Sequence, residues 1–285
     1  MSDQGFAGLR VLALESRRSA EMARLIENSG GIPTVAPSMR EVPLESNTEA
    51  LEFARVLLEG EFHVVIFLTG VGTRTLARAV ETAYPREKFA EALRRVAVVA
   101  RGPKPIAALK ELGVPVSVAV PEPNTWREIL EVLDAKRDSI PLQGRRVAVQ
   151  EYGVSNPELL AGLAGRGATV TRVPVYQWAL PEDTAPLRSA IYGIARGEFD
   201  AVLFTTSIQV VHLFKIAAEM KLDAEVRRAL ARTAIGSIGP TTSEEIKKYG
   251  LSPDLEPSHP KMGYLVKELS ERSGEILQRK RAQQQ

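Results

Sequence analysis

The chain has 285 residues, of which 44% are hydrophobic and 25% are charged, and its formal net charge is +2. These proportions are those of an ordinary globular protein and exclude a disordered chain. No apolar run approaches the roughly 20 residues that a membrane helix needs, and the absence of cysteine excludes disulfides, zinc ribbons and thiol catalysis. Because the N-terminus also lacks the pattern of a secretory signal, we expect a cytoplasmic protein without a membrane partner.

The first half of the chain alternates short apolar runs with amphipathic segments. Short β-branched runs predict buried strands, and a period near 3.6 residues predicts helices. We expect strands at residues 9–14, 63–68, 96–100 and 116–120, and helices at residues 19–29, 48–58, 73–81, 104–112 and 125–133. Residues 33–43 form an extended segment punctuated by proline.

The second half begins after a joint at residues 139–144 and shows the same alternation. We expect strands at 146–150, 169–175, 201–205, 233–238 and near 252–256, and helices at 157–166, 186–196, 209–220, 242–249 and 262–270. Residues 176–185 form a second extended segment, and the basic residues 279–281 are expected in a solvated, frayed tail or, less favoured, a nucleic-acid arm. The pattern predicts flavodoxin-like parallel sheets covered by helices on both faces, which bind ligands beyond the carboxyl ends of their strands.

The sequence repeats itself with a period close to 137 residues. Residues 61–67, EFHVVIF, return as residues 198–204, EFDAVLF, and a Gly-Pro pair at 102–103 returns at 239–240. A solenoid would have units of roughly 20–50 residues, so we interpret this period as a duplicated half-protein. Two similar halves predict a cleft between domains, where small-molecule sites usually lie.

Turns that follow the predicted strands are rich in Gly, Ser and Thr, and each opens a helix. Helix N-termini present unpaired N–H groups and a positive dipole end, which suit a phosphate or a carboxylate. Capping and turn formation alone remain the alternative for any single loop. The candidate ligand loops are residues 15–18 and 151–153, with the candidate substrate-binding residues Thr69, Gly70, Val71, Gly72, Arg101, Gly102, Lys104, Thr205, Thr206, Ser207, Gly239, Thr241 and Thr242.

Several familiar cofactor patterns are absent from the sequence. A G-x-G-x-x-G fingerprint starting at Gly70 would need glycine at position 75, which is Thr75, and no Gly-Lys-Ser/Thr occurs. The three histidines, at positions 63, 212 and 259, are too scattered to suggest a metal site. We therefore expect neither a nucleotide cofactor nor a metal ion.

Tyr176 follows the run Val173-Pro174-Val175, where the chain leaves one predicted domain. A tyrosine at this position either packs in a core or hinge, or faces a cleft. In the second case its hydroxyl would donate a proton or a hydrogen bond to a leaving group.

The order of these motifs resembles the uroporphyrinogen-III synthase family. A Phe-x-Thr/Ser pattern ends strands at 67–69 and 204–206, VPVYQ stands at 173–177, and IGPTT stands at 238–242. The resemblance covers roughly residues 9–269. It implies two flavodoxin-like α/β domains joined by two extended linker strands, with a cleft between them. The implied limits are 1–37 plus 184–285 for domain 1, 47–174 for domain 2, and 38–46 and 175–183 for the linkers.

The activity that the resemblance implies is that of a cyclising hydro-lyase of tetrapyrrole (heme, siroheme or cobalamin) biosynthesis. Such an enzyme removes the terminal hydroxyl of hydroxymethylbilane, forms an azafulvene, and inverts ring D through a spiro rearrangement to give uroporphyrinogen III. Without an enzyme the ring closes uninverted. The family uses no metal and no organic cofactor. The implied partners are the linear tetrapyrrole polycarboxylate and, transiently, the enzyme that supplies it; we expect a monomer that binds no nucleic acid.

The resemblance also implies roles for particular residues. Tyr176 matches a tyrosine credited with assisting hydroxyl departure, and Thr69 and Thr205 match hydroxyl positions at the two strand ends. Thr241 and Thr242 match the family's paired threonines. A non-catalytic binding or regulatory relative of the same fold is the alternative function.

This chain also departs from the family pattern. Arg101-Gly102-Pro103-Lys104 stands where many members carry a threonine, so the two cations are expected to pair with substrate carboxylates. Gly70-Val71-Gly72 replaces a Pro-Arg pair and favours backbone N–H donors.

Overall fold

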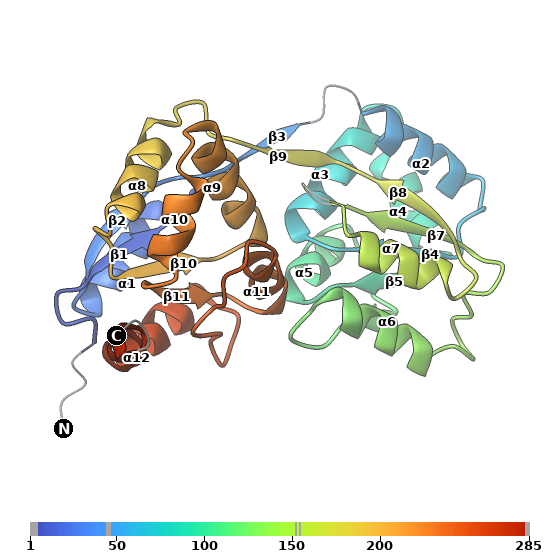
Figure 1. Ribbon diagram of the computed structural model, residues 1–285. Helices are drawn as coiled ribbons and strands as arrows, with labels where there is room; N and C mark the ends of the chain where they lie inside the picture. Colours follow the sequence, from blue (N-terminus) through green and yellow to red (C-terminus); the bar gives the residue numbers. More distant parts are fainter. Residues whose placement is uncertain (1–4, 44–46, 152, 154, 283–285) are drawn as a thin grey trace. The chain divides into compact units, whose positions relative to one another are not determined.

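The computed structural model describes residues 5–43, 47–151, 153 and 155–282. The chain divides into two compact units, unit 1 (Met1–Arg40 with Ala179–Gln285) and unit 2 (Glu41–Trp178) (Figure 1). Residues 44–46 of the first predicted linker and Tyr152 of a candidate loop lie outside the described residues. The domain limits expected from the sequence stay a prediction.

Unit 1 is a parallel sheet with helices on both faces. Its strands are β1 (Arg10–Ala13), β2 (Ile32–Val35), β10 (Ala201–Phe204) and β11 (Ala234–Ser237), and its helices are α1 (Ser19–Asn28), α8 (Ala185–Ala195), α9 (Ser207–Glu219), α10 (Asp223–Leu230), α11 (Pro240–Lys248) and α12 (Met262–Ala282). The strand order is β11-β10-β1-β2. Leu12 packs in the apolar cluster beneath α8 to α11, whereas its neighbour Val11 packs beneath α1 and α12. Both faces of β1, β10 and β11 are therefore largely buried, which explains their apolar sequences, whereas the edge strand β2 leaves Ile32 and Thr34 exposed.

Unit 2 has the same architecture with one more named strand. Its strands are β4 (Val64–Phe67), β5 (Ala97–Ala100), β6 (Val118–Ala119), β7 (Arg146–Gln150) and β8 (Thr169–Val173), and its helices are α2 (Thr48–Leu58), α3 (Gly70–Glu81), α4 (Arg86–Arg94), α5 (Pro103–Glu111), α6 (Trp126–Ala135) and α7 (Pro157–Ala164). The parallel strand order is β6-β5-β4-β7-β8. Helices α2 to α5 pack on one face of the sheet, and α6 and α7 pack on the other. The predicted class, mixed α/β with parallel sheets, is confirmed.

The strand register repeats the period of the sequence. Val11 lies opposite Ala201 in unit 1, and Val147 lies opposite Val64 in unit 2. Each unit combines strands from both halves of the duplication: β1 and β2 pair with β10 and β11, whereas β4 to β6 pair with β7 and β8. The two halves of the repeat therefore do not correspond to the two units.

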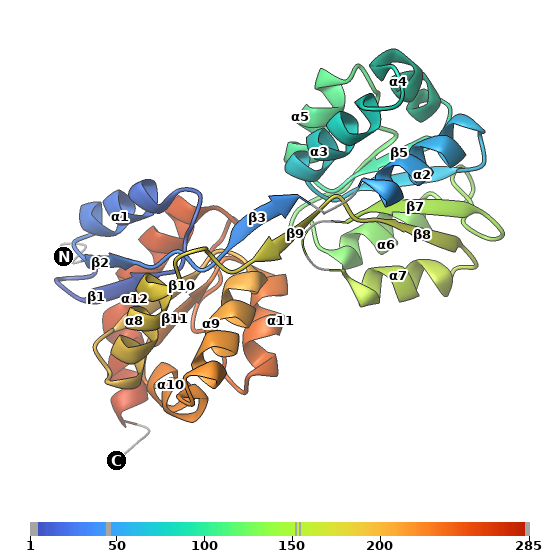
Figure 2. The ribbon, with the colours of Figure 1, turned by 90° about the horizontal axis from the view of Figure 1, so that it is seen from above.

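Two extended strands carry the chain from one unit to the other. These strands, β3 (Arg40–Pro43) and β9 (Tyr176–Ala179), lie side by side in a separate two-stranded sheet (Figure 2). Arg40 donates from Nε to the Leu180 carbonyl at 3.1 Å and pairs with Glu182 at 3.2 Å. Because this ion pair is exposed, it adds little to stability.

Most predicted elements are present with ends that differ by a few residues, but the helix expected at 262–270 continues to Ala282. Helices α4 and α10, which are equivalent under the 137-residue period, were not predicted because their many charged residues obscure a short apolar stripe. The strand expected near residues 252–256 is reduced to an isolated bridge between Gly236 and Leu255.

The basic tail is helical, so the expectation of a frayed C-terminus is wrong. Ile276 and Leu277 are buried on α12. The Nζ atom of Lys280 lies 2.6 Å from Asp254 and donates to the Thr233 carbonyl at 2.6 Å. Buried apolar contacts and a largely buried ion pair therefore hold this end of the helix on unit 1.

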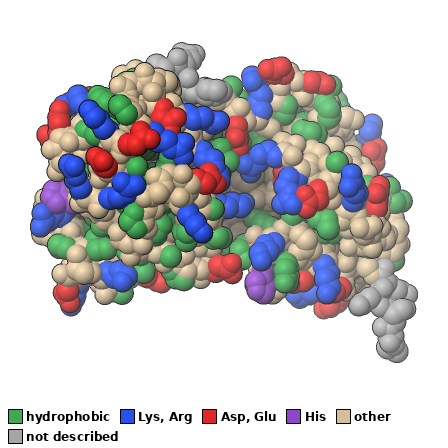
Figure 3. All heavy atoms as spheres, turned by 180° about the vertical axis from the view of Figure 1, so that it is seen from behind, with side chains coloured by type: hydrophobic (Ala, Val, Ile, Leu, Met, Phe, Trp, Pro, Cys, Tyr) green, Lys and Arg blue, Asp and Glu red, His purple; other side chains and the backbone are tan. Residues whose placement is uncertain are grey.

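The charged surface is mixed in sign. On the face drawn in Figure 3, Lys and Arg side chains are interspersed with Asp and Glu, as expected from 37 basic and 35 acidic residues. Within the described part of the chain, no helix combines the length and the hydropathy needed to span a bilayer.

Candidate functional site

Four candidate residues of unit 2, Thr69 to Gly72, lie where helix α3 begins, directly after β4. Thr69 caps this helix, because its Oγ1 accepts a hydrogen bond from the N–H of Gly72 at 3.0 Å. A side chain at Gly70 would overlap the Lys104 carbonyl, so glycine here lets α3 approach the start of α5 closely. Val71 is 37% exposed. This loop therefore presents backbone N–H groups and an exposed apolar side chain.

Tyr176 lies beside this loop, on β9. Its side chain is buried, its ring meets the Trp178 ring edge-on at 5.4 Å, and it shares an apolar cluster with Phe67. Its hydroxyl oxygen lies 3.5 Å from Thr69 Oγ1. The ring thus packs in the core of unit 2, as one sequence-based alternative requires. The hydroxyl nevertheless lies beside Thr69 of the candidate loop.

The second loop of unit 2, after β5, carries two cations. Arg101 is half-buried, and its Nε donates to the Leu68 carbonyl at 3.1 Å. Gly102 has a φ of +85°, and a side chain there would overlap Asn124, so only glycine suits this turn. Lys104 is exposed. Within the described part of the chain, its ammonium group has no ion-pair partner. It is available to an anionic ligand.

The loop after β7 is organised by a buried carboxylate. Glu151 accepts hydrogen bonds from Ser155 Oγ at 2.7 Å and from Arg172 Nε at 3.0 Å. The hydrogen bond to Glu151 raises the pKa of Arg172 above its ordinary value. Because both carboxylate oxygens of Glu151 are engaged, we assign it to the support of the loop.

In unit 1 the corresponding network joins β1, β10 and α9. The hydroxyl of Thr205 donates to Glu15 at 2.6 Å, and that buried carboxylate also accepts the N–H groups of Arg17 at 3.1 Å and Arg18 at 3.2 Å. Gln209 donates from Nε2 to Thr205 Oγ1 at 2.9 Å. The Thr205 hydroxyl is therefore committed to structure, and its donor is not available to a ligand.

Two other hydroxyls of the same loop are less engaged. Thr206 occupies the N-cap position of α9 but makes no side-chain capping bond, and Ser207 is the first residue of the helix. Both are half-buried. Of the three candidates in this loop, these two can offer a hydroxyl group to a ligand.

The two threonines of the loop after β11 differ in their exposure to solvent. Gly239 stands at the N-cap of α11. Thr242 is buried at 3% exposure, whereas Thr241 is half-buried. Below them, Ser243 Oγ donates to Ser237 Oγ at 2.9 Å and fixes the first turn of the helix. Thr241 is thus the threonine of the pair that a ligand can reach more easily.

Sequence reasoning missed the two buried glutamines that hold these loops. Gln150 Oε1 accepts the N–H of Thr69 at 3.4 Å, and Gln209 Oε1 accepts the N–H of Thr205 at 2.7 Å. Both glutamines are fully buried. An amide at the end of an otherwise apolar strand was the available signal for Gln150. Among the described residues, no group of three or more His, Asp or Glu side chains is arranged to hold a metal ion.

The fold and these loops define a mixed α/β protein whose candidate binding groups follow the carboxyl ends of parallel strands. The family profile described as uroporphyrinogen-III synthase HemD matches residues 20–267. The chain belongs to the uroporphyrinogen-III synthase family.

Two relatives cover most of the chain. The "Uncharacterized protein YjjA" of Bacillus subtilis (strain 168) is 33% identical over 268 residues, which are 94% of this chain and 97% of the relative. The "Putative uroporphyrinogen-III synthase" of Methanothermobacter thermautotrophicus is 32% identical over 238 residues, 82% of this chain and 87% of the relative.

Solved structures show the same fold. A crystal structure of a mutant uroporphyrinogen III synthase from Thermus thermophilus matches with a TM-score of 0.71 at 24% identity, over 95% of this chain and 100% of that chain. A wild-type structure of that enzyme in another crystal form gives 0.56 at 27% identity, over 95% and 99%. Both likenesses extend over the whole architecture, so the two-domain parallel α/β fold is shared.

Proposed function

We propose that this protein is a uroporphyrinogen-III synthase, which closes hydroxymethylbilane into uroporphyrinogen III with ring D inverted and releases one water. The family match over residues 20–267 carries this proposal. The shared fold and the relative described as a uroporphyrinogen-III synthase support it.

The candidate loops suit a substrate rich in carboxylates. The N-termini of α3, α5, α9 and α11 all follow strand ends and present N–H groups that can donate to anions. Lys104 adds a point charge at the start of α5, and Arg101 adds a guanidinium nearby. We propose that these groups bind the propionate and acetate side chains and hold the flexible chain in a conformation ready to close.

Tyr176 is proposed to assist loss of the terminal hydroxyl. Its phenolic O–H, beside Thr69, would donate a hydrogen bond or a proton to the departing oxygen, which leaves as water and yields the azafulvene. Ring D then attacks through its substituted α-carbon to give the spiro intermediate, which breaks and recloses inverted. The proton released on final closure restores the phenol, so the reaction has no net proton change. The packing of the Tyr176 ring against Trp178 fixes the position of its hydroxyl oxygen.

The proposal also includes a positioning residue in unit 1 and a route by which the substrate reaches the protein. Glu15 would act as a positioning residue, because it fixes both Thr205 and the backbone of the loop after β1. We propose a cytoplasmic monomer that works without metal or organic cofactor and receives hydroxymethylbilane from the enzyme that makes it. Sedimentation of the protein alone would test the monomeric state. Sedimentation of a mixture with that enzyme would test the contact between the two proteins.

The test is a coupled assay in which hydroxymethylbilane is generated in place and the oxidised porphyrins are separated by isomer. We expect type III product to rise with protein concentration above the spontaneous type I background. Type I product alone, from protein with a native circular-dichroism spectrum, would overturn the proposal and favour a non-catalytic relative of the same fold.

The contribution of the cation in the α5 loop can be measured in the same assay. Lys104→Ala should raise the KM by a few fold with little change in kcat, because an exposed charge binds the substrate in the ground state and in the transition state alike. Lys110→Ala, on the same helix and also exposed, is the matched control. Equal effects of the two substitutions would remove Lys104 from the substrate site.

A further inference from the structure

Unit 1 has a pocket at the amino ends of its strands, the edge opposite the ligand loops. We call it the amino-edge pocket; its volume is about 530 Å³, within the range of small-molecule sites. Phe199 and Asp200 precede β10, and Thr233 precedes β11, which places the pocket at that edge. The complete lining is Ala195, Arg196, Gly197, Phe199, Asp200, Glu225, Arg228, Ala229, Arg232, Thr233, Leu277, Lys280 and Arg281.

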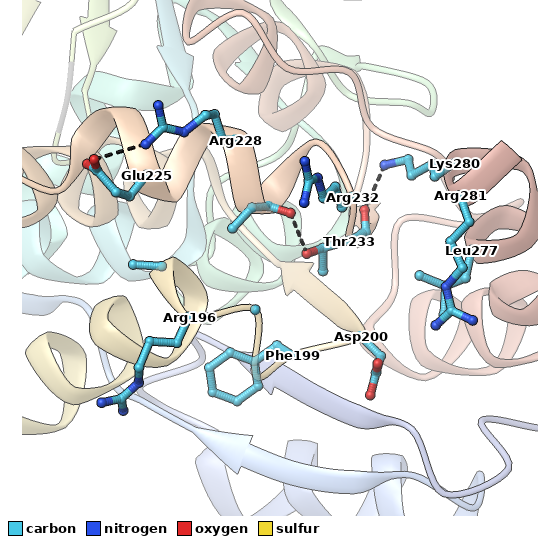
Figure 4. Close-up of a pocket in the computed structure, with 13 residues that line it drawn as sticks. Arg196, Phe199, Asp200, Glu225, Arg228, Arg232, Thr233, Leu277, Lys280 and Arg281 are labelled. Atoms are coloured by element: carbon cyan, nitrogen blue, oxygen red, sulfur yellow. Dashed lines mark hydrogen bonds and ion pairs between the residues drawn. The ribbon is translucent and has the colours of Figure 1, made fainter. Parts of the chain in front are cut away.

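The lining carries five cations and two carboxylates, and both carboxylates are already paired. Asp200 pairs with Arg10 at 3.3 Å, and Glu225 pairs with Arg228 at 3.0 Å. Figure 4 shows cationic side chains from α10, from the turn after it and from α12 around Phe199 and Asp200. The side chains of Arg232 and Arg281 make no ion pair or hydrogen bond within the described part of the chain. Two guanidinium groups are thus uncompensated at one pocket.

The second copy of the duplication retains a cation at the position of Arg232, where unit 2 has Arg95, but not at the positions of Arg196 and Arg228. Unit 2 carries Glu59 and Glu91 at the positions equivalent to Arg196 and Arg228, 137 residues earlier. Arg196 and Glu59 both occupy the C-cap of a helix. The negative end of a helix dipole would favour a cation at both positions, yet only unit 1 has one. Helix capping therefore does not explain Arg196, whereas a cation near the end of the helix is common to both copies at Arg232 and Arg95.

One wall of the pocket also has no equivalent in unit 2. Helix α12 has 21 residues, whereas its counterpart α6 has 10 and ends at Ala135. The added turns bring Leu277, Lys280 and Arg281 to the pocket. Lys280 is anchored to Asp254, so this wall is held in place. The extension completes a concave site that the repeat alone would leave open.

We propose that the amino-edge pocket binds a small organic polyanion with at least two carboxylate or phosphate groups. Arg232 and Arg281 pair with these groups, since guanidinium matches the planar geometry of a carboxylate and the spacing of two phosphate oxygens. The half-buried ring of Phe199 and the side chain of Leu277 provide an apolar surface for the carbon skeleton of the ligand. Within unit 1, this site lies at the opposite edge of the sheet from the loops proposed for the synthase reaction.

Binding can be tested by titration calorimetry of the full chain at low salt, with citrate as the polycarboxylate probe and inorganic pyrophosphate as the phosphate probe. At least one probe should bind, and Arg232→Glu and Arg281→Glu should each raise its dissociation constant about tenfold or more. Both arginines are exposed, so the variants should keep the native circular-dichroism spectrum. The probe that binds more tightly identifies the anion class.

Two control variants separate specific binding from the other possibilities. Arg95→Glu changes the net charge equally at the unit 2 position equivalent to Arg232 and should change the dissociation constant by less than about twofold. Lys104→Glu tests binding at the proposed substrate loops and should also have little effect. The proposal is overturned if neither probe binds at about 10 mM, a concentration at which even a weak ionic site would be detected, or if either control weakens binding as much as Arg232→Glu. None of these results depends on synthase activity.

Discussion

Gln150 and Gln209 perform the same structural task from different elements of the two units. Gln150 ends strand β7, and its Oε1 accepts the N–H of Thr69. Gln209 lies in helix α9, and its Oε1 accepts the N–H of Thr205. In each unit, therefore, a buried glutamine amide fixes the backbone of a candidate residue directly after a strand: Thr69 after β4 and Thr205 after β10. The duplication preserves the hydrogen bond but not the residue that makes it.

The position of Gly72 explains how unit 2 accommodates this difference. Under the 137-residue period, Gly72 in unit 2 corresponds to Gln209 in unit 1. Strands β1 and β7 are related by a period that is one residue shorter, so Gln150 corresponds to Leu14. A side chain at Gly72 would overlap the Gln150 amide. Gly72 and Gln150 therefore depend on each other, because the glutamine amide fits only if residue 72 has no side chain.

Gly72→Ala should destabilise the protein. Alanine favours a helix interior over glycine by about 1 kcal/mol, but the added methyl must displace the Gln150 amide. Overpacking of this kind lowers the free energy of unfolding by about 1–3 kcal/mol. Urea unfolding followed by circular dichroism measures the change. Gly274→Ala on α12, where an added methyl meets nothing within 4 Å, should leave stability equal or higher.

A double substitution that gives unit 2 the residues of unit 1 tests the coupling of these two positions more directly. Gly72→Gln together with Gln150→Leu reproduces in unit 2 the residues found in unit 1. The double variant should be more stable than the sum of the two single changes predicts, because the new helix glutamine regains the lost hydrogen bonds. Strict additivity in the double-mutant cycle would contradict the idea that the two positions are coupled.

Tyr176→Phe should separate the packing of this ring from its chemistry. Phenylalanine keeps the edge-on contact with Trp178 and loses only the hydroxyl near Thr69. We expect turnover to type III product to fall roughly a hundredfold, the lower end of acid–base contributions. Stability should change by about 1 kcal/mol, the usual net contribution of a hydrogen bond.

The matched control for this change is Tyr192→Phe, at an exposed tyrosine on α8. It should leave both turnover and the isomer ratio unchanged. If Tyr176→Phe also leaves turnover unchanged, Tyr176 has no part in the mechanism and only packs.

The sequence predicts the sheets well because the duplication supplies two versions of each strand. The strand at 146–150 coincides with β7, and the helix at 48–58 coincides with α2. The helices expected from residues 104 and 242 begin one and two residues earlier, at Pro103 and Pro240, because proline after Gly102 and Gly239 suits the first position of a helix. Local signals of this kind require no knowledge of tertiary contacts.

The features that escaped prediction depend on contacts between distant residues. Neither the coupling of Gly72 with Gln150 nor the burial of Glu15 under Thr205 leaves a local pattern. The extension of α12 was missed because its apolar positions are few, and its charged end is held by Asp254. Only the folded chain shows that these polar side chains are committed to structure.

Asp254→Ala should cost about 3–5 kcal/mol of unfolding free energy. Its buried carboxylate accepts the N–H of Ile235 at 2.8 Å and pairs with Lys280 at 2.6 Å and with Arg279 at 3.3 Å. Removal leaves the Lys280 ammonium, on a side chain that is only 12% exposed, without its anion. Thermal unfolding measures the loss.

The control for Asp254 is Asp223→Ala, which breaks an exposed ion pair with Arg227 at 3.8 Å. Such surface pairs contribute about 0–1 kcal/mol, so this variant should unfold nearly as the parent does. A comparable loss in both variants would show that the Asp254 network does not anchor α12.

His212 links helix α9 to the segment that leads into β3. Its buried Nδ1 lies 2.7 Å from the Ser38 carbonyl. Because a carbonyl only accepts, Nδ1 carries the proton and the neutral ring suffices for this bond. Burial lowers the pKa of His212 below its ordinary value of 6.5; the bond to Ser38 opposes this shift, and the charge of Lys215 adds to it.

This lowered pKa predicts how stability changes with pH. Between the folded-state pKa and 6.5 the unfolded chain binds more protons at this histidine than the native chain does, so the free energy of unfolding increases with pH there. The contribution of His212 is complete above pH 6.5 and is lost as the pH falls below that value. Urea unfolding at about pH 7.5 and about pH 5.5, on either side of the ordinary histidine pKa, should show a smaller decrease for His212→Asn, which keeps a donor near Nδ1 but does not titrate. The same decrease in both proteins would assign the pH dependence to other groups.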